Sequence, residues 1–260
     1  MQRKAIYLLP NFFTTLTIFG GFYAIVMAIN GHFATSAAAV FGAMIADSLD
    51  GRIARMMNSQ SEFGKQYDSL ADLIGFGIAP ALTVYLWALQ DLKNVAEILG
   101  KAGWLVAFIY TCCAALRLAR FNIHEPGPAE KGFFIGLPSP AAAAIVMSFV
   151  WFGEEVLMNL QLSDPYLASD IRSAVPYIAL LLTLFTALLM VSTIKYNSFK
   201  NLGTKVVVPF SMMIAVVLCL AALMIDPATT LFAFFLLFWL SGPIRWGLSK
   251  IRKPKSLPLP

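Results

Sequence analysis

Charged residues are scarce in this chain of 260 residues. Only 13% of the residues are Asp, Glu, Lys or Arg, whereas 59% are hydrophobic and the mean hydropathy is +0.74. Soluble domains usually carry about one quarter charged residues, so this scarcity excludes an ordinary soluble domain and indicates a membrane protein. The net charge of +5 comes from basic residues that orient the chain in the membrane, and we infer no nucleic-acid partner from it.

Cysteine and histidine are also rare, with three and two residues respectively. Cys112 and Cys113 are adjacent in one apolar run and Cys219 lies in another, which predicts reduced packing residues and excludes a disulfide framework. Neither His32 nor His124 has a partner at metal-ligand spacing. A zinc site built from histidine and cysteine is therefore not expected.

Long polar segments are missing as well, and the sequence is divided into apolar runs. A run of roughly 18 or more residues is long enough to span a bilayer. Eight such runs are present, at about 11–30, 33–53, 68–90, 103–121, 138–158, 174–194, 206–225 and 228–247. We therefore predict an all-α integral membrane protein with about eight transmembrane helices. Because no loop is long enough for a separate catalytic domain, a catalytic site would have to be built from helix ends.

Basic residues are nearly absent from one side of this predicted topology. If both termini are cytoplasmic, 16 of the 19 basic residues face the cytoplasm, and only Lys93, Lys101 and Arg172 face the opposite side. This asymmetry follows the positive-inside rule and predicts cytoplasmic termini with an even number of spans. The basic, proline-rich tail at 249–260 is expected to rest on anionic headgroups.

Four of the acidic residues are concentrated at one place. Asp47 and Asp50 lie three residues apart near the end of the second apolar run, and Asp68 and Asp72 lie four apart in the third. Helical periodicity places each pair on one face of its helix. A carboxylate in hydrocarbon is costly, and the nearby arginines are too few to neutralise all four. We therefore predict that the two helices face each other and hold a divalent cation.

Small residues share these faces. Gly51 lies one turn after Asp47, Ala54 one turn after Asp50, and Gly64 one turn before Asp68, which leaves room for a bulky ligand close to the backbone. Oxygen-only ligands favour Mg²⁺, Mn²⁺ or Ca²⁺ over zinc, and Arg55 is placed to meet phosphate. Carboxylates, a divalent cation, a small-residue pocket and an arginine together indicate metal-assisted phosphoryl transfer.

Two other interpretations of the aspartates remain open. A single aspartate at a helix end is more often a cap or a solvated interfacial residue, although four in register on two helices fit that explanation poorly. An ion-coupled transporter also carries acids inside the membrane, but near its midplane. The four aspartates instead lie at the predicted cytoplasmic helix ends, beside Arg52, Arg55 and Lys65.

The spacing of these residues resembles a family signature. The pattern Asp47-x2-Asp50-Gly51-x2-Ala54-Arg55-x8-Gly64-x3-Asp68-x3-Asp72 matches that of the CDP-alcohol phosphotransferase family at every fixed position. The resemblance covers roughly residues 8–195. It implies a homodimer with a six-helix catalytic core and a site at the cytoplasmic face of the cell (inner) membrane. The implied reaction moves a group from a CDP-linked lipid to an alcohol and releases CMP.

Flanking segments narrow the resemblance to bacterial membrane-bound phosphatidylserine synthases. They are Tyr67-Asp68-Ser69-Leu70-Ala71-Asp72, Gly75-Phe76-Gly77-Ile78-Ala79-Pro80, Leu116-Arg117-Leu118-Ala119-Arg120-Phe121-Asn122 and Gly136-Leu137-Pro138-Ser139-Pro140-Ala141-Ala142. The implied substrates are CDP-diacylglycerol and L-serine, met among membrane phospholipids. Glycerol phosphate, inositol phosphate or choline would be the alternative acceptors within the wider family.

The resemblance also implies a role for each matching residue. Asp47, Asp50 and Asp68 hold Mg²⁺ or Mn²⁺, with Asp47 and Asp68 shared between two metal sites, and Asp72 is both a ligand and the general base. Ca²⁺ could occupy the same site. The CDP moiety is expected to contact Asn11, Thr14, Gly51, Ala54, Arg55, Ser61 and Gly64. For Asn11 and Thr14, helix-start chemistry is an equally good explanation.

The serine carboxylate needs a cationic partner. Arg117 and Arg120 lie at the predicted cytoplasmic end of the fourth span, and a guanidinium suits bidentate carboxylate binding. Positive-inside anchoring is the competing explanation for both. Of the two, we expect Arg120, beside Asn122, to be the better candidate.

These observations divide the chain into three predicted parts. Residues 1–200 form the catalytic core of six transmembrane helices, residues 201–248 add two C-terminal transmembrane helices, and residues 249–260 form the cytoplasmic tail. The signature lies wholly in the first part.

Overall fold

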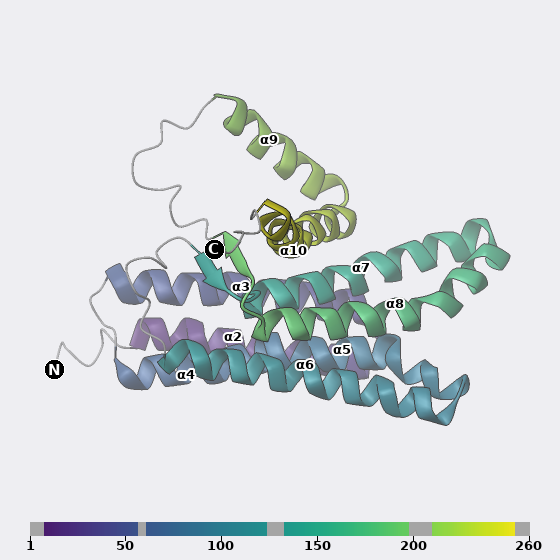
Figure 1. The fold of residues 1–260 in the computed structure, drawn as a ribbon, viewed down its shortest axis with the longest axis horizontal. Coiled ribbons are helices and arrows are strands. Elements are labelled where there is room, and N and C mark those ends of the chain that lie inside the picture. Colours follow the sequence, from purple (N-terminus) through teal and green to yellow (C-terminus); the bar gives the residue numbers. More distant parts are fainter. Residues whose placement is uncertain (1–7, 57–60, 124–132, 198–209, 253–260) are drawn as a thin grey trace, which may run out of the picture.

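The computed structural model describes residues 8–56, 61–123, 133–197 and 210–252. Its helices run side by side for most of the chain, and α2, α3, α4–α5, α6, α7 and α8 form one elongated bundle (Figure 1). The helical elements are α2 (Leu8–Ile29), α3 (Phe33–Met56), α4 (Glu62–Asp72), η1 (Leu73–Ile78), α5 (Ala79–Trp87), η2 (Leu89–Asn94), α6 (Glu97–Ile123), α7 (Ser139–Ser163), α8 (Pro165–Val191), α9 (Phe210–Ile225) and α10 (Pro227–Arg252).

The prediction of an all-α membrane protein is confirmed. In the described part of the chain, six helical segments are long and apolar enough to cross a membrane: Asn11–Ile29, Glu62–Trp87, Glu97–Ile123, Ser139–Ser163, Pro165–Val191 and Pro227–Leu248. The predicted spans 33–53 and 206–225 are not among them. They correspond to α3, which carries the charged residues of the signature, and to α9, which has only 16 residues. The count of eight spans and the cytoplasmic termini stay predictions.

Two helices begin earlier than the apolar runs suggest, because polar residues cap them. The Ser61 hydroxyl accepts a hydrogen bond from the Gly64 amide at 3.0 Å, so α4 begins at Glu62 and not near residue 68. The Asp164 carboxylate accepts from the Leu167 amide at 3.1 Å, and Pro165 opens α8 well before residue 174. Such N-caps satisfy amides that the first helical turn leaves unpaired.

A wide helical turn follows the last signature aspartate. Segment η1 is a π-helix that continues α4 into α5 without a break, and Pro80 stands at the start of α5. Proline has no amide hydrogen, so Pro80 cannot donate to the carbonyl of Phe76, four residues earlier. The buried Tyr110 of α6 donates its hydroxyl to that carbonyl at 3.1 Å. The bond links α6 to η1 in the buried interior of the bundle.

Glycines bring α2 into backbone contact with its neighbours. A Cβ on Gly20 would lie 3.0 Å from the Ala43 Cβ of α3, and a Cβ on Gly21 would lie 2.8 Å from the Gly75 Cα of η1. Small residues at such crossings allow close van der Waals packing between membrane helices. As a result α2 is held against both of the elements that carry or adjoin the aspartates.

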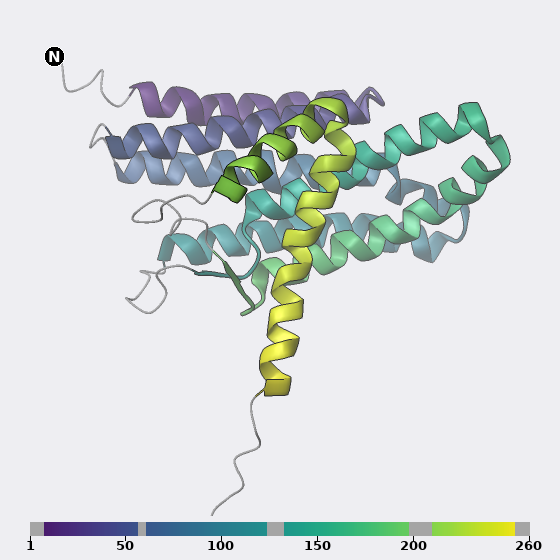
Figure 2. The same cartoon turned by 90° about the horizontal axis from the view of Figure 1, so that it is seen from above.

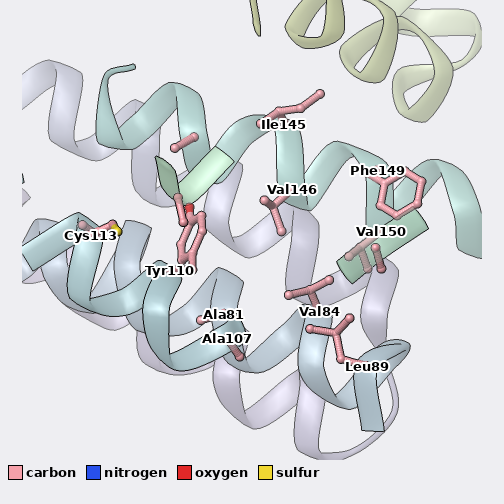
Figure 3. Packing of buried hydrophobic residues seen from close by; sticks show 14 of the residues in the cluster. Ala81, Val84, Leu89, Ala107, Tyr110, Cys113, Ile145, Val146, Phe149 and Val150 are labelled. Atoms are coloured by element: carbon pink, nitrogen blue, oxygen red, sulfur yellow. The ribbon is translucent and has the colours of Figure 1, made fainter. Parts of the chain in front are cut away.

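The main hydrophobic cluster lies between α5, α6, α7 and α8. Figure 3 shows Val84, Tyr110 and Val146 pointing into the space between their helices. Cys113 is buried in this cluster and Cys112 is half-buried, as predicted for packing residues, and all three cysteines are free. Cys219 is exposed on α9, so the packing role predicted for it is wrong.

A small sheet and two helices complete the fold. Strands β1 (Phe133–Ile135) and β2 (Lys195–Asn197) pair antiparallel and join the start of α7 to the end of α8. Helix α10 then crosses the bundle over α7 and does not run alongside it (Figure 2), an arrangement the apolar runs did not predict. Aromatic contacts hold it there: Phe232 stacks on Phe152 at 5.0 Å between ring centroids, and Phe238 packs on Tyr196 at 5.6 Å.

Tyr196 is the polar anchor of this crossing. It is 1% exposed, and Gly242 of α10 leaves space for its ring. Burial raises the pKa of Tyr196 to about 12, so the phenol stays protonated at neutral pH and donates to the Trp239 carbonyl at 3.3 Å.

The backbone contact at Gly21 generates a stability prediction. In Gly21→Ala the new methyl group would meet the Gly75 backbone, which cannot move aside as a flexible side chain would. We expect this variant to lower the unfolding temperature measured in detergent. The matched control is Gly42→Ala on α3, where nothing lies within 4 Å and alanine should be neutral or mildly stabilising. Equal unfolding temperatures for the two variants would contradict the assigned contact.

Candidate active site

The structure brings together the carboxylates of two successive helices. Asp47 and Asp50 come from α3, and Asp68 and Asp72 come from α4. One carboxylate oxygen from each of Asp47, Asp50 and Asp68 lies within 4.8 Å of the others. Asp50 is buried, and Asp47 and Asp68 are half-buried. The predicted juxtaposition of the two helices is therefore present.

Asp72 lies beside this group of three and extends it. It is one turn further along α4 than Asp68, and its carboxylate is close enough to those of Asp47 and Asp68 for strong electrostatic repulsion. Among the described residues, the Oδ1 atoms of Asp68 and Asp72 are buried without a hydrogen-bond partner, so the group has unused acceptor capacity.

These residues fit a divalent metal ion. The donor set is entirely oxygen, and two of its buried oxygens lack any partner. Hard cations such as Mg²⁺, Mn²⁺ and Ca²⁺ take carboxylate oxygens of this kind. The Thr14 hydroxyl donates to Asp50 Oδ2 at 2.8 Å, and hydrogen bonds to a ligating carboxylate fix its orientation.

The residues predicted to contact CDP are only partly described. Asn11, Ser61 and Gly64 gather at one point, where a Cβ on Gly64 would lie 3.1 Å from Ser61 Oγ and 3.7 Å from Asn11 Oδ1. Gly51 is half-buried on α3. Ala54 and Arg55 belong to α3, but their side chains lie outside the described part of the structure.

Helix-start chemistry does not account for Thr14. Helix α2 is already formed at Leu8, so Thr14 lies in its second turn and is 4% exposed. Its hydroxyl is engaged by Asp50. A separate hydrogen bond joins α2 to α4, between Thr15 and the Tyr67 hydroxyl at 2.9 Å. The geometry therefore gives Thr14 a part in holding a carboxylate, whereas Asn11 remains next to the predicted nucleotide residues.

Of the two predicted acceptor arginines, Arg117 is closer to the carboxylates. It is half-buried and donates through Nη1 to Ser139 Oγ at 2.8 Å, while its Nε is buried without a partner. Asp72 exerts a favourable Coulomb interaction on it. Arg120 is exposed. The geometry thus favours Arg117 where the sequence analysis favoured Arg120.

Asn122 ties α6 to α4. The side-chain amide of Asn122 donates to Ser69 Oγ at 2.9 Å, and its backbone carbonyl accepts from Lys65 Nζ at 3.3 Å. The sequence analysis assigned no role to Ser69, Lys65 or Ser139. Each lies in or beside a segment quoted for the family resemblance, but spacing along the chain does not show which residues on different helices become partners.

This chain belongs to the CDP-alcohol phosphatidyltransferase family, whose sequence model matches residues 7–185. The matched part contains all four aspartates, Arg117 and Ser139, and it ends within α8.

Several relatives carry the name CDP-diacylglycerol–serine O-phosphatidyltransferase. The protein of that name from Helicobacter pylori is 34% identical over 246 residues, which cover 95% of this chain and 94% of the relative. The one from Methanocaldococcus jannaschii is 34% identical over 218 residues, covering 84% and 85%. The one from Bacillus subtilis is 37% identical over 114 residues, covering 43% of this chain and 59% of its own length.

The carboxylate group generates a prediction about metal binding that does not depend on turnover. Purified protein should bind Mn²⁺, as followed by electron paramagnetic resonance of the free ion. Asp50→Asn and Asp68→Asn should each weaken that binding by at least about tenfold, because a charged ligand is replaced by a neutral one. Asp226→Asn is the control, since Asp226 caps α10 and is remote in sequence from the group. Unchanged Mn²⁺ affinity in both site variants would exclude these carboxylates as ligands.

Proposed function

We propose that this chain is a phosphatidylserine synthase. It transfers the phosphatidyl group of CDP-diacylglycerol to the hydroxyl of L-serine and releases CMP. The observation that carries the proposal is the oxygen cluster of Asp47, Asp50 and Asp68, with Asp72 beside it, in a chain of this family. The named relatives support serine as the acceptor, because one of them aligns with 95% of the chain.

The donor is held at its diphosphate and at its nucleotide. Asp47, Asp50 and Asp68 would hold Mg²⁺ or Mn²⁺, which when bound offsets the negative charge of the diphosphate and of the departing CMP. Thr14 keeps Asp50 in position through its 2.8 Å hydrogen bond. Asn11 and Ser61 offer polar groups to the nucleotide, and Gly64 and Gly51 leave space beside the backbone. Arg55, at the end of α3, carries the predicted phosphate contact.

Asp72 acts as the proton acceptor. As the serine Oγ attacks the lipid-side phosphorus, an O–P bond forms, the P–O bond to CMP breaks, and the serine hydroxyl loses its proton. Asp72 Oδ1 is buried and has no hydrogen-bond partner, so it has a free lone pair for that proton. A carboxylate within hydrogen-bonding reach of the nucleophile is a suitable general base.

Arg117 binds the serine carboxylate. Its Nη1 is held by Ser139, which fixes the guanidinium plane, and its Nε remains available. Charge-assisted hydrogen bonds from guanidinium to carboxylate are strong and directional. Arg117 also interacts electrostatically with Asp72. A serine whose carboxylate is bound by Arg117 therefore has its hydroxyl near Asp72, the proposed base.

The active site lies at the cytoplasmic face of the inner membrane. Support comes from the distribution of the basic residues. The end of the bundle with the aspartates carries Arg52, Lys65, Arg117 and Arg120, whereas the other end carries Lys93, Lys101 and Arg172. The positive-inside rule assigns the first end to the cytoplasm. We retain the proposal of a homodimer, and we count α3 as a span because it packs within the bundle (Figure 1). The crosswise α10 (Figure 2) and the 16-residue α9 do not support the two further spans of the predicted eight.

The decisive experiment follows CMP release from CDP-diacylglycerol by the purified protein with Mg²⁺ or Mn²⁺ and a panel of acceptors. We expect release with L-serine and little with glycerol phosphate, inositol phosphate or choline, and a chelator should abolish it. Asp72→Asn should lose at least about a hundredfold in rate, because a proton acceptor is removed while size is kept.

Three other results of the CMP-release experiment would contradict parts of this proposal. Release with a different alcohol would keep the family reaction and overturn serine as the acceptor. An absence of CMP with every alcohol would favour the transporter interpretation of the intramembrane acids. Near-normal turnover in Asp72→Asn would place the base elsewhere.

A kinetic comparison of two arginines on α6 tests the acceptor site. Arg117→Gln should raise the KM for serine roughly 10- to 150-fold, the equivalent of a lost charge-assisted bond of about 1.5–3 kcal/mol, and leave the KM for CDP-diacylglycerol nearly unchanged. Arg120→Gln, one turn away and exposed, is the matched control and should leave both constants nearly unchanged. If Arg120→Gln raises the serine KM and Arg117→Gln does not, Arg120 is the acceptor residue.

A further inference from the structure

A cavity of about 310 Å³ lies at the end of the bundle opposite the aspartates. Its wall includes Phe33 at the start of α3, Trp87 at the end of α5, Asp91 of η2, Glu154 of α7 and Arg172 of α8. None of these residues belongs to the carboxylate site or to the proposed acceptor site. The catalytic reaction therefore leaves this cavity without a role.

The shape of the bundle shelters the cavity. The α7–α8 hairpin reaches further along the bundle axis than the end of α2 and the start of α3, as both views show (Figures 1 and 2). Ser163 lies ten residues beyond Gly153, or roughly 15 Å of helix. Leu157, Met158 and Leu162 of this overhang line the cavity together with Gln161, so this wall is mostly apolar.

The charged residues of the cavity are not paired with one another. Among the described residues the only ion pair joins Lys101 to Glu97, so Asp91, Glu154 and Arg172 line a common space without forming a salt bridge. Asp91 and Arg172 are exposed and Glu154 is half-buried, so all three are open to a ligand that enters the cavity. A ligand that carries both a cation and an anion would supply partners for all three.

Glu154 is held in a defined position. Its Oε2 accepts a hydrogen bond from the Trp87 indole at 2.8 Å, and the adjacent Gly153 lets the Trp87 ring lie against α7. Its other oxygen receives no hydrogen bond from the described residues. The cavity thus has an oriented acceptor on α7, a guanidinium on α8 and a mostly apolar wall on the overhang.

We propose that this cavity binds the headgroup of a zwitterionic aminophospholipid. The primary ammonium group would lie between Asp91 and Glu154, the phosphate would meet Arg172, and the first acyl carbons would pack on Leu157 and Leu162. The side chains of the site sum to one negative charge, so a headgroup of zero net charge fits better than an anionic one. A quaternary ammonium could not donate hydrogen bonds to the two carboxylates.

The test uses the full-length protein in lipid nanodiscs or mild detergent, with native mass spectrometry to count retained lipids. Phosphatidylethanolamine, phosphatidylcholine and phosphatidylglycerol with identical acyl chains are supplied at equal concentration. We expect preferential retention of phosphatidylethanolamine by the wild type. Glu154→Gln and Arg172→Gln should each reduce that retention by about tenfold or more, as expected for a lost charge-assisted contact. Lys101→Gln, an exposed position paired with Glu97, is the control and should behave as the wild type.

Several outcomes would overturn the proposal. In the first, the wild type retains the three lipids equally. In the second, Glu154→Gln and Arg172→Gln both retain phosphatidylethanolamine as well as the wild type does. Glu154→Gln keeps the acceptor for Trp87, so it reports on the cavity even if Arg172→Gln fails to fold. A soluble competitor, glycerophosphoethanolamine, separates a lipid from a free zwitterion. If it displaces the lipid at equal molar concentration, the site recognises a soluble molecule and the lipid assignment is wrong.

Discussion

Repulsion among carboxylates at one end of an apolar bundle is the constraint on which the rest of the structure depends. At 4.8 Å, the limit that encloses the oxygens of Asp47, Asp50 and Asp68, an ionised pair is destabilised by about 3 kcal/mol at an effective dielectric constant near 20. Helices α3 and α4 would separate if nothing else held them. The contacts of α2 oppose that separation, since it reaches Asp50 through Thr14 and Tyr67 through Thr15. The close packing of α2 is therefore needed to keep the mutually repelling carboxylates of α3 and α4 together.

The two ends of the bundle carry different arrangements of charge. The aspartate end concentrates one sign of charge and leaves acceptor oxygens without partners, which suits a cation and a diphosphate. The opposite end places both signs around a cavity with an apolar wall, which suits a ligand of no net charge. In both cases the unpaired polar groups, and not the apolar surface, indicate what is bound. An apolar surface on a membrane helix is covered by lipid in any case.

Much of the site could be predicted from the sequence because helical periodicity is regular. Asp47 with Asp50, and Asp68 with Asp72, are brought to facing surfaces by a repeat of 3.6 residues per turn, and no tertiary information is needed for that. Contacts between helices are another matter. The pairs Thr14–Asp50 and Arg117–Ser139 depend on how helices distant in sequence rotate against each other. The crossing of α10 depends on Gly242 and an aromatic cluster. The hydropathy of a segment does not show how the resulting helix is oriented relative to the others.

The bond from Tyr110 to the Phe76 carbonyl has a mechanical consequence. Together with Ser69–Asn122 and Lys65–Asn122, it joins the continuous α4–η1–α5 helix to α6 at separate levels along their length. Arg117 lies two turns beyond Tyr110 on α6, and Asp72 lies one turn before Phe76 on the joined helix. These links hold the joined helix and α6 together on both sides of Asp72 and Arg117, so the two helices cannot slide past each other near the base and the acceptor arginine without breaking them.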